Sequence, residues 1–232
     1  MEFIIDNLKT IKTNIKEHSS KFNRNFENIR LIAVSKTFPI HYIKKAYETG
    51  IKDFAENKAQ ELRNKAAELK NYNIRWHFIG RIQTNKIKYI VPISEYIHSV
   101  YREKEIKEID KTAKKYNKIQ KILIEVNISG EETKGGIKPN ELNEFLKQAK
   151  KYENVKVVGL MTMAPYTDDH DTIKSVFCEL KNLRDSFTKN FPDLKELSMG
   201  MSNDYTIAIE CGSTMLRIGS LIFGKRNYNT GG

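Results

Sequence analysis

Short apolar runs alternate with longer amphipathic stretches along this 232-residue chain, and this alternation constrains the fold more than any other feature. Several runs are rich in β-branched or aromatic residues, as buried strands are. We expect eight strands, at residues 30–36, 53–56, 75–80, 96–100, 121–127, 155–163, 196–200 and 215–224.

The stretches between these runs carry an apolar residue every three or four positions among many charges, which is typical of surface helices. Pro139 suits the first turn of a helix, and Asp168 or Asp169 suits the cap of the next one. We expect helices at residues 59–69, 102–115, 139–150 and 171–190, and an extra one at about residues 1–18.

Strands that alternate with helices favour a parallel sheet with right-handed crossovers. Eight such units predict a single (β/α)8 barrel domain over residues 1–232, preceded by the extra N-terminal helix. The alternative is an open doubly wound sheet, which requires a glycine-rich turn after the first strand. The turn here is Ser35-Lys36-Thr37-Phe38-Pro39, without glycine, so we prefer the barrel.

The net charge of +11 raises the question of nucleic acid, but the basic residues are scattered and interleaved with acids. We therefore expect no specific nucleic-acid partner. Cys178 and Cys211 are far apart without metal-type spacing, so we expect free thiols in a reducing cytoplasm. No apolar run reaches eighteen residues and the N-terminus lacks a signal-peptide layout, so we expect no membrane partner.

Polar residues gather where the expected strands end, which in such barrels is the face that carries active sites. They are Lys36, Glu56, Asn57, His77, Arg81, Asn127, Ser198, Ser202 and Arg217, together with Met161 and Met163. No metal-type cluster appears, and His41 and His98 look like ordinary surface or core histidines. The middles of the strands are apolar, so we expect one polar rim.

Lys36 ends the first strand and is the residue with the clearest chemistry. A lysine among apolar residues loses solvation of its ammonium, its pKa falls, and the neutral amine attacks aldehydes. The alternative is a lysine that reaches solvent or pairs with Glu56.

The last third of the chain adds hydroxyls and glycines that suit a phosphate. The Ser198-Met199-Gly200-Met201-Ser202 segment and the segment from Arg217 through Gly219 to Ser220 lie after the seventh strand and around the end of the eighth, where such barrels bind phosphate. Taken alone, each segment is explained equally well by serines and glycines that form turns and helix caps. A phosphate together with an aldehyde indicates pyridoxal 5′-phosphate.

At these residues the chain resembles the YggS/PROSC family of pyridoxal phosphate homeostasis proteins. Ala55 is a small departure, because the family usually has glycine there. The matching stretches are residues 33–36, 54–61, 76–86, 126–136, 159–163, 197–204 and 217–224, and the most specific are Trp-His-Phe-Ile-Gly and Ser-Met-Gly-Met-Ser.

The resemblance implies that Lys36 holds the cofactor as a Schiff base, an internal aldimine, and that Arg217 approaches the pyridine nitrogen. It also implies that Asn57 lies near the ring, with Met161 and His77 on the pocket wall. The phosphate ligands that it implies are Ser198, Ser202, Gly219 and Ser220.

The implied function is buffering of pyridoxal phosphate and possible delivery to apo-enzymes, by a monomer without substantial turnover. The alternative is an amino-acid racemase. That activity needs a second base, which relatives take from a separate domain, and too few residues follow the eighth strand for one. Lys134, in the loop after the fifth strand, is either a solvated loop lysine or a residue that assists release.

Overall fold

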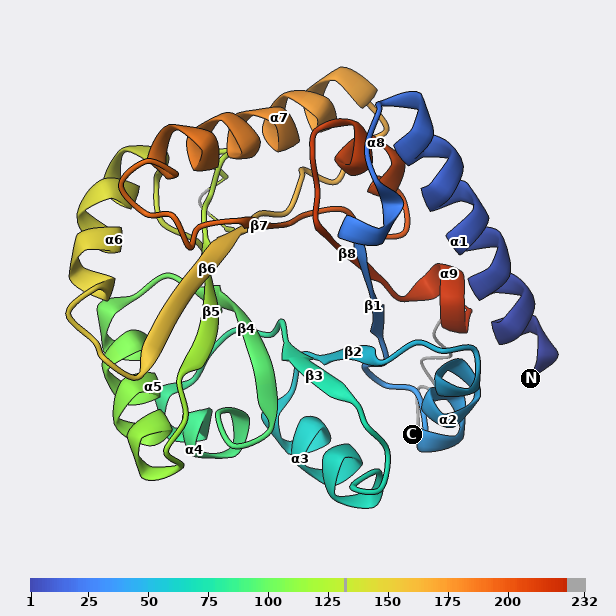
Figure 1. The fold of residues 1–232 in the computed structure, drawn as a ribbon, viewed down its shortest axis with the longest axis horizontal. Coiled ribbons are helices and arrows are strands. Elements are labelled where there is room, and N and C mark those ends of the chain that lie inside the picture. Colours follow the sequence, from blue (N-terminus) through green and yellow to red (C-terminus); the bar gives the residue numbers. More distant parts are fainter. Residues whose placement is uncertain (132, 225–232) are drawn as a thin grey trace.

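The computed structural model, which describes residues 1–131 and 133–224, is a closed barrel of eight parallel strands in chain order (Figure 1). The part of the single-domain prediction that covers Glu132 and residues 225–232 lies outside the described residues. The strands are β1 (Arg30–Val34), β2 (Asp53–Glu56), β3 (Arg75–Phe78), β4 (Ser94–Val100), β5 (Gln120–Glu125), β6 (Val155–Met161), β7 (Glu196–Ser198) and β8 (Met215–Ile218). The predicted barrel is confirmed.

Helices surround the barrel, and their apolar stripes pack against the outer faces of the strands. Three short 3-10 turns, Phe26–Asn28, Thr84–Lys86 and Pro139–Glu141, lie in the connections. The α-helices are α1 (Glu2–Lys21), α2 (Ile40–Glu48), α3 (Ala59–Glu68), α4 (Ile87–Ile90), α5 (Glu103–Lys115), α6 (Leu142–Ala149), α7 (His170–Phe187), α8 (Tyr205–Glu210) and α9 (Ser220–Phe223).

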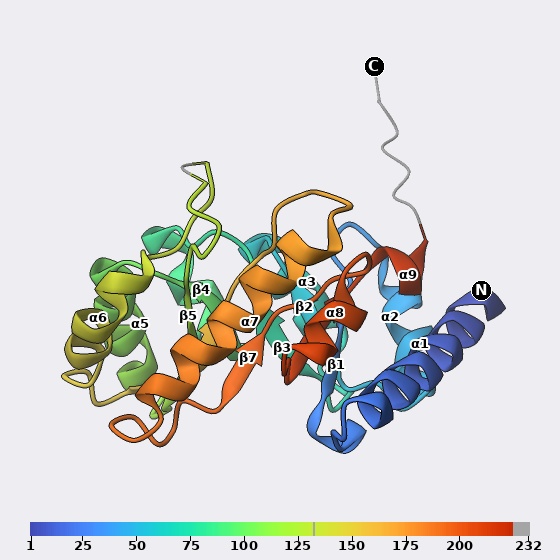
Figure 2. The ribbon, with the colours of Figure 1, turned by 90° about the horizontal axis from the view of Figure 1, so that it is seen from above.

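The extra helix α1 packs outside the barrel against α2, α8 and α9. Its buried residues Ile4, Leu8, Ile11 and Ile15 recur every three or four positions, so they form one apolar stripe. The helix therefore supports two of the segments that follow the last strands. Figure 2 shows that α9 and the connection after β5 lie on the same side of the barrel.

The barrel interior is filled by side chains, as in other barrels of this size. An apolar cluster distinct from the outer core lies in the interior and includes Val34, Leu123 and Met161. Several buried polar residues share the interior with it, among them His77, His98 and Ser198. These polar residues are important for the site described below.

Five of the observed strands end two residues before the predicted ends, and β2 and β4 end where predicted. The largest difference concerns the last strand, which was predicted to run to Gly224 and ends at Ile218. After Gly219 the chain turns into α9, where the amides of Ile222 and Phe223 bond to the carbonyl of Gly219. An apolar run of this length does not distinguish a strand from a strand followed by a helical turn.

The helix starts follow the sequence signals. The side chain of Asp169 accepts a hydrogen bond from the amide of Thr172 and caps α7, as one of the two predicted alternatives. Pro139 opens a 3-10 turn that leads into α6. None of the described helices is long and apolar enough to cross a membrane.

The expectation of free thiols is wrong in this structure, because Cys178 and Cys211 form a disulfide. Cys178 lies on α7 and Cys211 follows α8, and these two helices pack together. Their packing brings the two Cα atoms within 4.8 Å, which is inside the range that a disulfide spans. The sequence separation of the two cysteines did not reveal this proximity.

Candidate functional site at the mouth of the barrel

Lys36 lies two residues after the end of β1, half-buried, in the turn predicted at the rim. The next residue, Thr37, has a φ of 70°, which is strained for a β-branched residue. The amide of Thr37 donates to Oε1 of Glu61 at 2.7 Å, and the amide of Phe38 donates to the carbonyl of Ser35. These bonds hold the turn and therefore fix the place from which the Lys36 side chain starts.

A buried polar cluster adjoins this turn. The Lys65 ammonium donates to the Ser35 carbonyl at 2.7 Å and to Oε1 of Glu56 at 2.8 Å, and it also pairs with Glu61. The Ser35 hydroxyl donates to the same Glu56 oxygen at 2.6 Å. Burial raises the pKa of Glu56 to about 7, although Lys65 opposes the shift. The structure thus pairs Glu56 with Lys65, a lysine that the sequence did not single out.

Asn57 follows β2 at the same rim, beside the end of β3. Its side-chain oxygen is buried and has no hydrogen-bond partner in the described part of the structure. A Cβ at Gly80 would lie only 1.9 Å from the Asn57 carbonyl oxygen, so only glycine permits this close approach. The unpartnered side-chain oxygen of Asn57 therefore lies at the mouth, where a ligand can donate a hydrogen bond to it.

The segments after β7 and β8 meet at the mouth, as predicted for a phosphate site. The Ser202 hydroxyl lies 3.4 Å from the amide of Leu221, in the turn that contains Gly219 and Ser220. The Gly200 carbonyl accepts from the Arg217 amide at 2.9 Å, which ties the two segments together. The structure therefore brings Ser202 next to Gly219 and Ser220.

Gly200 itself has a φ of 96°, a conformation that favours glycine. A Cβ there would lie 2.6 Å from Cβ of Ala208 and 2.9 Å from Cδ2 of Leu216. Gly200 therefore lets the segment pass close to α8 and β8, and it sets the position of the hydroxyl of Ser202.

The Arg217 guanidinium is buried inside the upper end of the barrel. Its Nη1 donates to the Ser198 hydroxyl at 2.6 Å, and its Nη2 donates to the Thr162 carbonyl at 3.0 Å. Burial lowers the pKa of Arg217 to about 10, and the charges of Asp204 and Glu125 oppose the shift. The guanidinium is thus a cation at neutral pH.

Three other residues predicted for the site lie deeper than expected. The Ser198 hydroxyl is fully buried between Arg217 and His98, and it does not join Ser202 at the mouth. The imidazole of His77 is fully buried between Asp53 and His98, below the predicted pocket wall. Met161 packs in the interior cluster. Their side chains point into the barrel because inward and outward positions alternate along a strand.

Besides Lys65, sequence reasoning missed two groups that belong to this region. His98 was interpreted as an ordinary histidine, yet it links His77 to Ser198. Glu125, at the end of β5, is buried, and burial raises its pKa to about 7 against the attraction of Arg217. Its place at a strand end, two residues before Asn127, was the signal that could have identified it.

The connection after β5 covers Glu125. A Cβ at Gly135 would lie 3.4 Å from Oε1 of Glu125, so this connection passes directly over the carboxylate. Lys134 pairs with Glu131 at 2.6 Å and donates to the Ala164 carbonyl at 3.1 Å. The structure therefore places Lys134 at the mouth, with its ammonium bound to its own loop and to the segment after β6.

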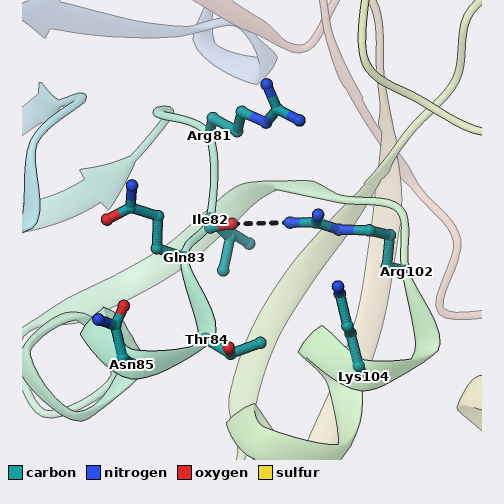
Figure 3. A pocket seen from close by; sticks show the side chains of 7 residues that line it. All are labelled: Arg81, Ile82, Gln83, Thr84, Asn85, Arg102 and Lys104. Carbon is teal, nitrogen blue, oxygen red and sulfur yellow. Dashed lines mark hydrogen bonds between the residues drawn. The ribbon is translucent and has the colours of Figure 1, made fainter.

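A basic pocket of about 500 Å³ lies beside the mouth, between the segment after β3 and the start of α5 (Figure 3). Figure 3 shows the Arg102 guanidinium reaching the Ile82 carbonyl, where its Nη2 donates at 2.7 Å. Arg102 is also paired with Glu105. The pocket contains none of the residues predicted to bind phosphate, which come from the opposite strands. Its lining is Arg81, Ile82, Gln83, Thr84, Asn85, Arg102 and Lys104.

The fold and this mouth define a class: the barrel is that of the alanine racemase N-terminal domain, whose family model matches residues 7–227. An alanine racemase of Clostridium difficile, 17% identical, has the same fold with a TM-score of 0.71, over 97% of this chain and 58% of that one. Within this class the chain belongs to the family of pyridoxal phosphate homeostasis proteins.

The family is shown by relatives that match along nearly the whole chain. A pyridoxal phosphate homeostasis protein of Aquifex aeolicus is 42% identical over 224 residues, which are 96% of this chain and 98% of the relative. PipY of Synechococcus elongatus, in a structure with pyridoxal phosphate bound, is 31% identical with a TM-score of 0.81. The match covers 90% of this chain and all of PipY.

Across residues 1–131 and 133–224 there is no group of three or more histidine, cysteine or acidic side chains placed to hold a metal ion. The groups at the mouth are instead Lys36, the Asn57 side-chain oxygen and the Ser202 hydroxyl, and the guanidinium of Arg217 is buried below them. These groups fit an organic phosphate that carries an aldehyde and a ring.

Proposed function

We propose that this protein binds pyridoxal 5′-phosphate at the barrel mouth as a Schiff base on Lys36. In this proposal it buffers the free cofactor in the cytoplasm as a monomer and delivers it to apo-enzymes. The observation that carries the proposal is the place of Lys36, at the rim of a barrel whose relative PipY has been solved with pyridoxal phosphate.

The described residues fit the parts of this cofactor. The unpartnered amide of Asn57 is available to a hydroxyl on the ring, and a buried polar atom without a partner is costly unless a ligand supplies one. The Ser202 hydroxyl and the amides from Gly219 to Leu221 suit the phosphate. Ser198 is the exception, because its hydroxyl is used inside the barrel.

Arg217 determines what the bound cofactor can do. The cofactor supplies an electron sink for carbanions, and it does so best when its pyridine nitrogen is protonated. A guanidinium with a pKa of about 10 stays charged at neutral pH and disfavours a second positive charge next to it. Arg217 at the nitrogen thus supports storage of the cofactor rather than turnover.

The alternative function, amino-acid racemisation, needs two bases on opposite faces of the substrate. Tyr205 is buried, and its hydroxyl accepts from Asn14 of α1 at 3.2 Å, on the outside of the barrel. Tyr166 is fully exposed. Neither tyrosine is held opposite Lys36, which favours the carrier.

Reductive trapping tests the covalent site. The protein is incubated with pyridoxal phosphate, reduced with borohydride, digested and analysed by mass spectrometry. We expect the pyridoxyl mass on the Lys36 peptide in the wild type and no modification there in Lys36→Arg. Predominant labelling of another lysine would contradict the proposal. The same preparation, given L-alanine, should produce no D-alanine above background, and clear turnover would favour the racemase.

Delivery is tested separately from binding. We expect a cofactor-loaded sample to activate an apo-enzyme faster than the bound cofactor dissociates from this protein into solution. The variant Lys134→Ala should keep the Lys36 adduct and change the transfer rate, because Lys134 lies at the mouth. Transfer that equals the dissociation rate would leave passive buffering alone, and an unchanged rate in Lys134→Ala would exclude a role for this lysine.

A further inference from the structure

A line of hydrogen bonds runs through the interior of the barrel and ends at Arg217. Arg217 Nη1 lies 2.6 Å from Ser198 Oγ, which lies 2.8 Å from His98 Nδ1. His98 Nε2 lies 2.9 Å from His77 Nδ1, and His77 Nε2 lies 3.0 Å from Asp53 Oδ1. The binding of the cofactor, as proposed above, uses only the Arg217 end of this line.

The carboxylate at the far end fixes where the protons lie. Burial opposes the ionisation of Asp53, but hydrogen bonds from His77 and Arg75 outweigh it and lower its pKa to about 2. An ionised carboxylate only accepts, so His77 must donate from Nε2. Arg75 donates to both oxygens of Asp53, at 2.9 and 2.5 Å, and holds the carboxylate in place.

The remaining protons follow from the neutral state of both imidazoles. Burial lowers the pKa of His77 and lowers that of His98 still further. A neutral His77 that donates from Nε2 must accept at Nδ1, so His98 donates from Nε2 and accepts at Nδ1. The Ser198 hydroxyl then donates to His98 and offers its lone pair to Arg217.

The charged groups that face the two histidines support this arrangement. The cations Arg30 and Arg75 oppose a positive charge on His77, and Arg217 and Arg30 oppose one on His98. The ring of Tyr96 stacks on His77 with a centroid distance of 4.9 Å and an interplanar angle of 7°. Asp53 is thus the anion at the end of the line, and it also forms salt bridges with Arg75 and Arg30.

We propose that Ser198, His98, His77 and Asp53 are positioning residues for Arg217, joined in one line in which every hydrogen bond is donated toward Asp53. The line fixes the plane of the guanidinium, so that its other N–H groups face the mouth. This inference rests on the proposed function, which assigns Arg217 to the pyridine nitrogen of the cofactor. It also assigns to Ser198 a role other than the phosphate contact implied by the resemblance.

The protonation pattern can be tested in the cofactor-free protein. We expect nitrogen-15 imidazole spectra to show His77 and His98 as neutral Nε2–H tautomers that do not titrate between pH 5.5 and 8. A histidine of the pair that protonates near pH 6.5, or carries its proton on Nδ1, would overturn the proposal. This result does not depend on whether pyridoxal phosphate binds.

The positioning role is tested by affinity. His98→Leu removes the acceptor for Ser198, so we expect pyridoxal phosphate to bind about tenfold more weakly. His98→Asn keeps an acceptor near the Nδ1 position, so we expect affinity within about twofold of the wild type. Ser198→Ala should resemble His98→Leu. The matched control is Ser94→Ala, because Ser94 is a buried interior serine whose hydroxyl has no partner in the described part of the chain.

A second ligand separates positioning from general damage to the site. Glyceraldehyde 3-phosphate carries an aldehyde and a phosphate but no pyridine ring, so its binding to Lys36 should be the same in His98→Leu and the wild type. Equal losses for both ligands, or loss in His98→Asn as large as in His98→Leu, would contradict the positioning role. If the wild type binds neither ligand, the proposed function fails, while the spectra still test the line.

Discussion

At the scale of the residue, the rim depends on glycines, which have no side chain, as well as on polar side chains. Gly80 lets the end of β3 approach Asn57, where a Cβ would lie 1.9 Å from a backbone carbonyl oxygen. That oxygen cannot move without shifting the strand end. The unpartnered amide of Asn57 keeps its place only while this approach is possible.

The variant Gly80→Ala should therefore lower the free energy of unfolding by about 2–4 kcal/mol, the cost of forcing backbone apart. The measurement is denaturant unfolding. Gly135→Ala is the control, because the nearest atom to its Cβ would be a side-chain atom at 3.3 Å. We expect the control to change by less than about 1 kcal/mol. Equal effects of the two variants would contradict the close approach.

Glu125 makes stability depend on pH. Its pKa is raised to about 7 in the folded chain, so the folded state holds a proton that the unfolded state releases above the usual value of 4.5. Stability therefore falls as the pH rises from about 4.5 to about 7. We expect Glu125→Gln to remove part of this fall, of order 2 kcal/mol, in unfolding measured across that range without cofactor. A pH profile unchanged by the substitution would show that Glu125 is ionised at little cost.

The residues also show how far sequence reasoning reaches. Lys36 and Asn57 follow apolar runs that end clearly, and in the structure they lie just after β1 and β2. Ser198 and His77 were predicted for the mouth and lie inside the barrel. A shift of one residue in a strand reverses the direction of a side chain, and a sequence without a register does not fix that direction.

At the scale of the element, helix α1 is a support for the mouth. It packs against α8, which follows the segment that contains Ser202, and against α9, which begins at Ser220. Its residue Leu8 is fully buried in that contact layer. The helical spacing of its apolar residues predicted this helix, but only the structure shows which elements it covers.

The variant Leu8→Ala should lower the free energy of unfolding by about 2–4 kcal/mol, through lost burial and the cavity left behind. The neighbouring Lys9 is exposed, so Lys9→Ala serves as the control and should change stability by less than about 0.5 kcal/mol. Thermal unfolding monitored by circular dichroism measures both. A loss below about 1 kcal/mol in Leu8→Ala would mean that α1 is only loosely attached.

Two elements could not be derived from the sequence. The apolar run after Met215 predicts one strand, yet its second half is α9, which begins directly after Gly219. A Cβ at Gly219 would lie 3.2 Å from the Val34 carbonyl oxygen, so the chain turns where it passes close to β1. The disulfide depends on the packing of α7 on α8. The sequence separation of the two cysteines does not indicate that these helices are in contact. Both outcomes are set by tertiary contacts.

At the scale of the whole molecule, hydrogen bonds inside the barrel link residues near its two opposite ends. Asp53 lies at the start of β2 and Arg217 lies near the end of β8, and the line through His77, His98 and Ser198 joins them. Eight alternating units were enough to predict the closed barrel. Polar residues within its interior could not be assigned to this line before the strands were in register.

The central claim is that Lys36 holds pyridoxal phosphate at the mouth of the barrel. The most direct measurement is the visible absorption spectrum of the purified protein mixed with the cofactor, recorded beside Lys36→Ala and Lys134→Ala. We predict a protonated Schiff-base band in the wild type and in Lys134→Ala, and none in Lys36→Ala. A band that persists in Lys36→Ala, or that is missing from the wild type, would contradict the claim.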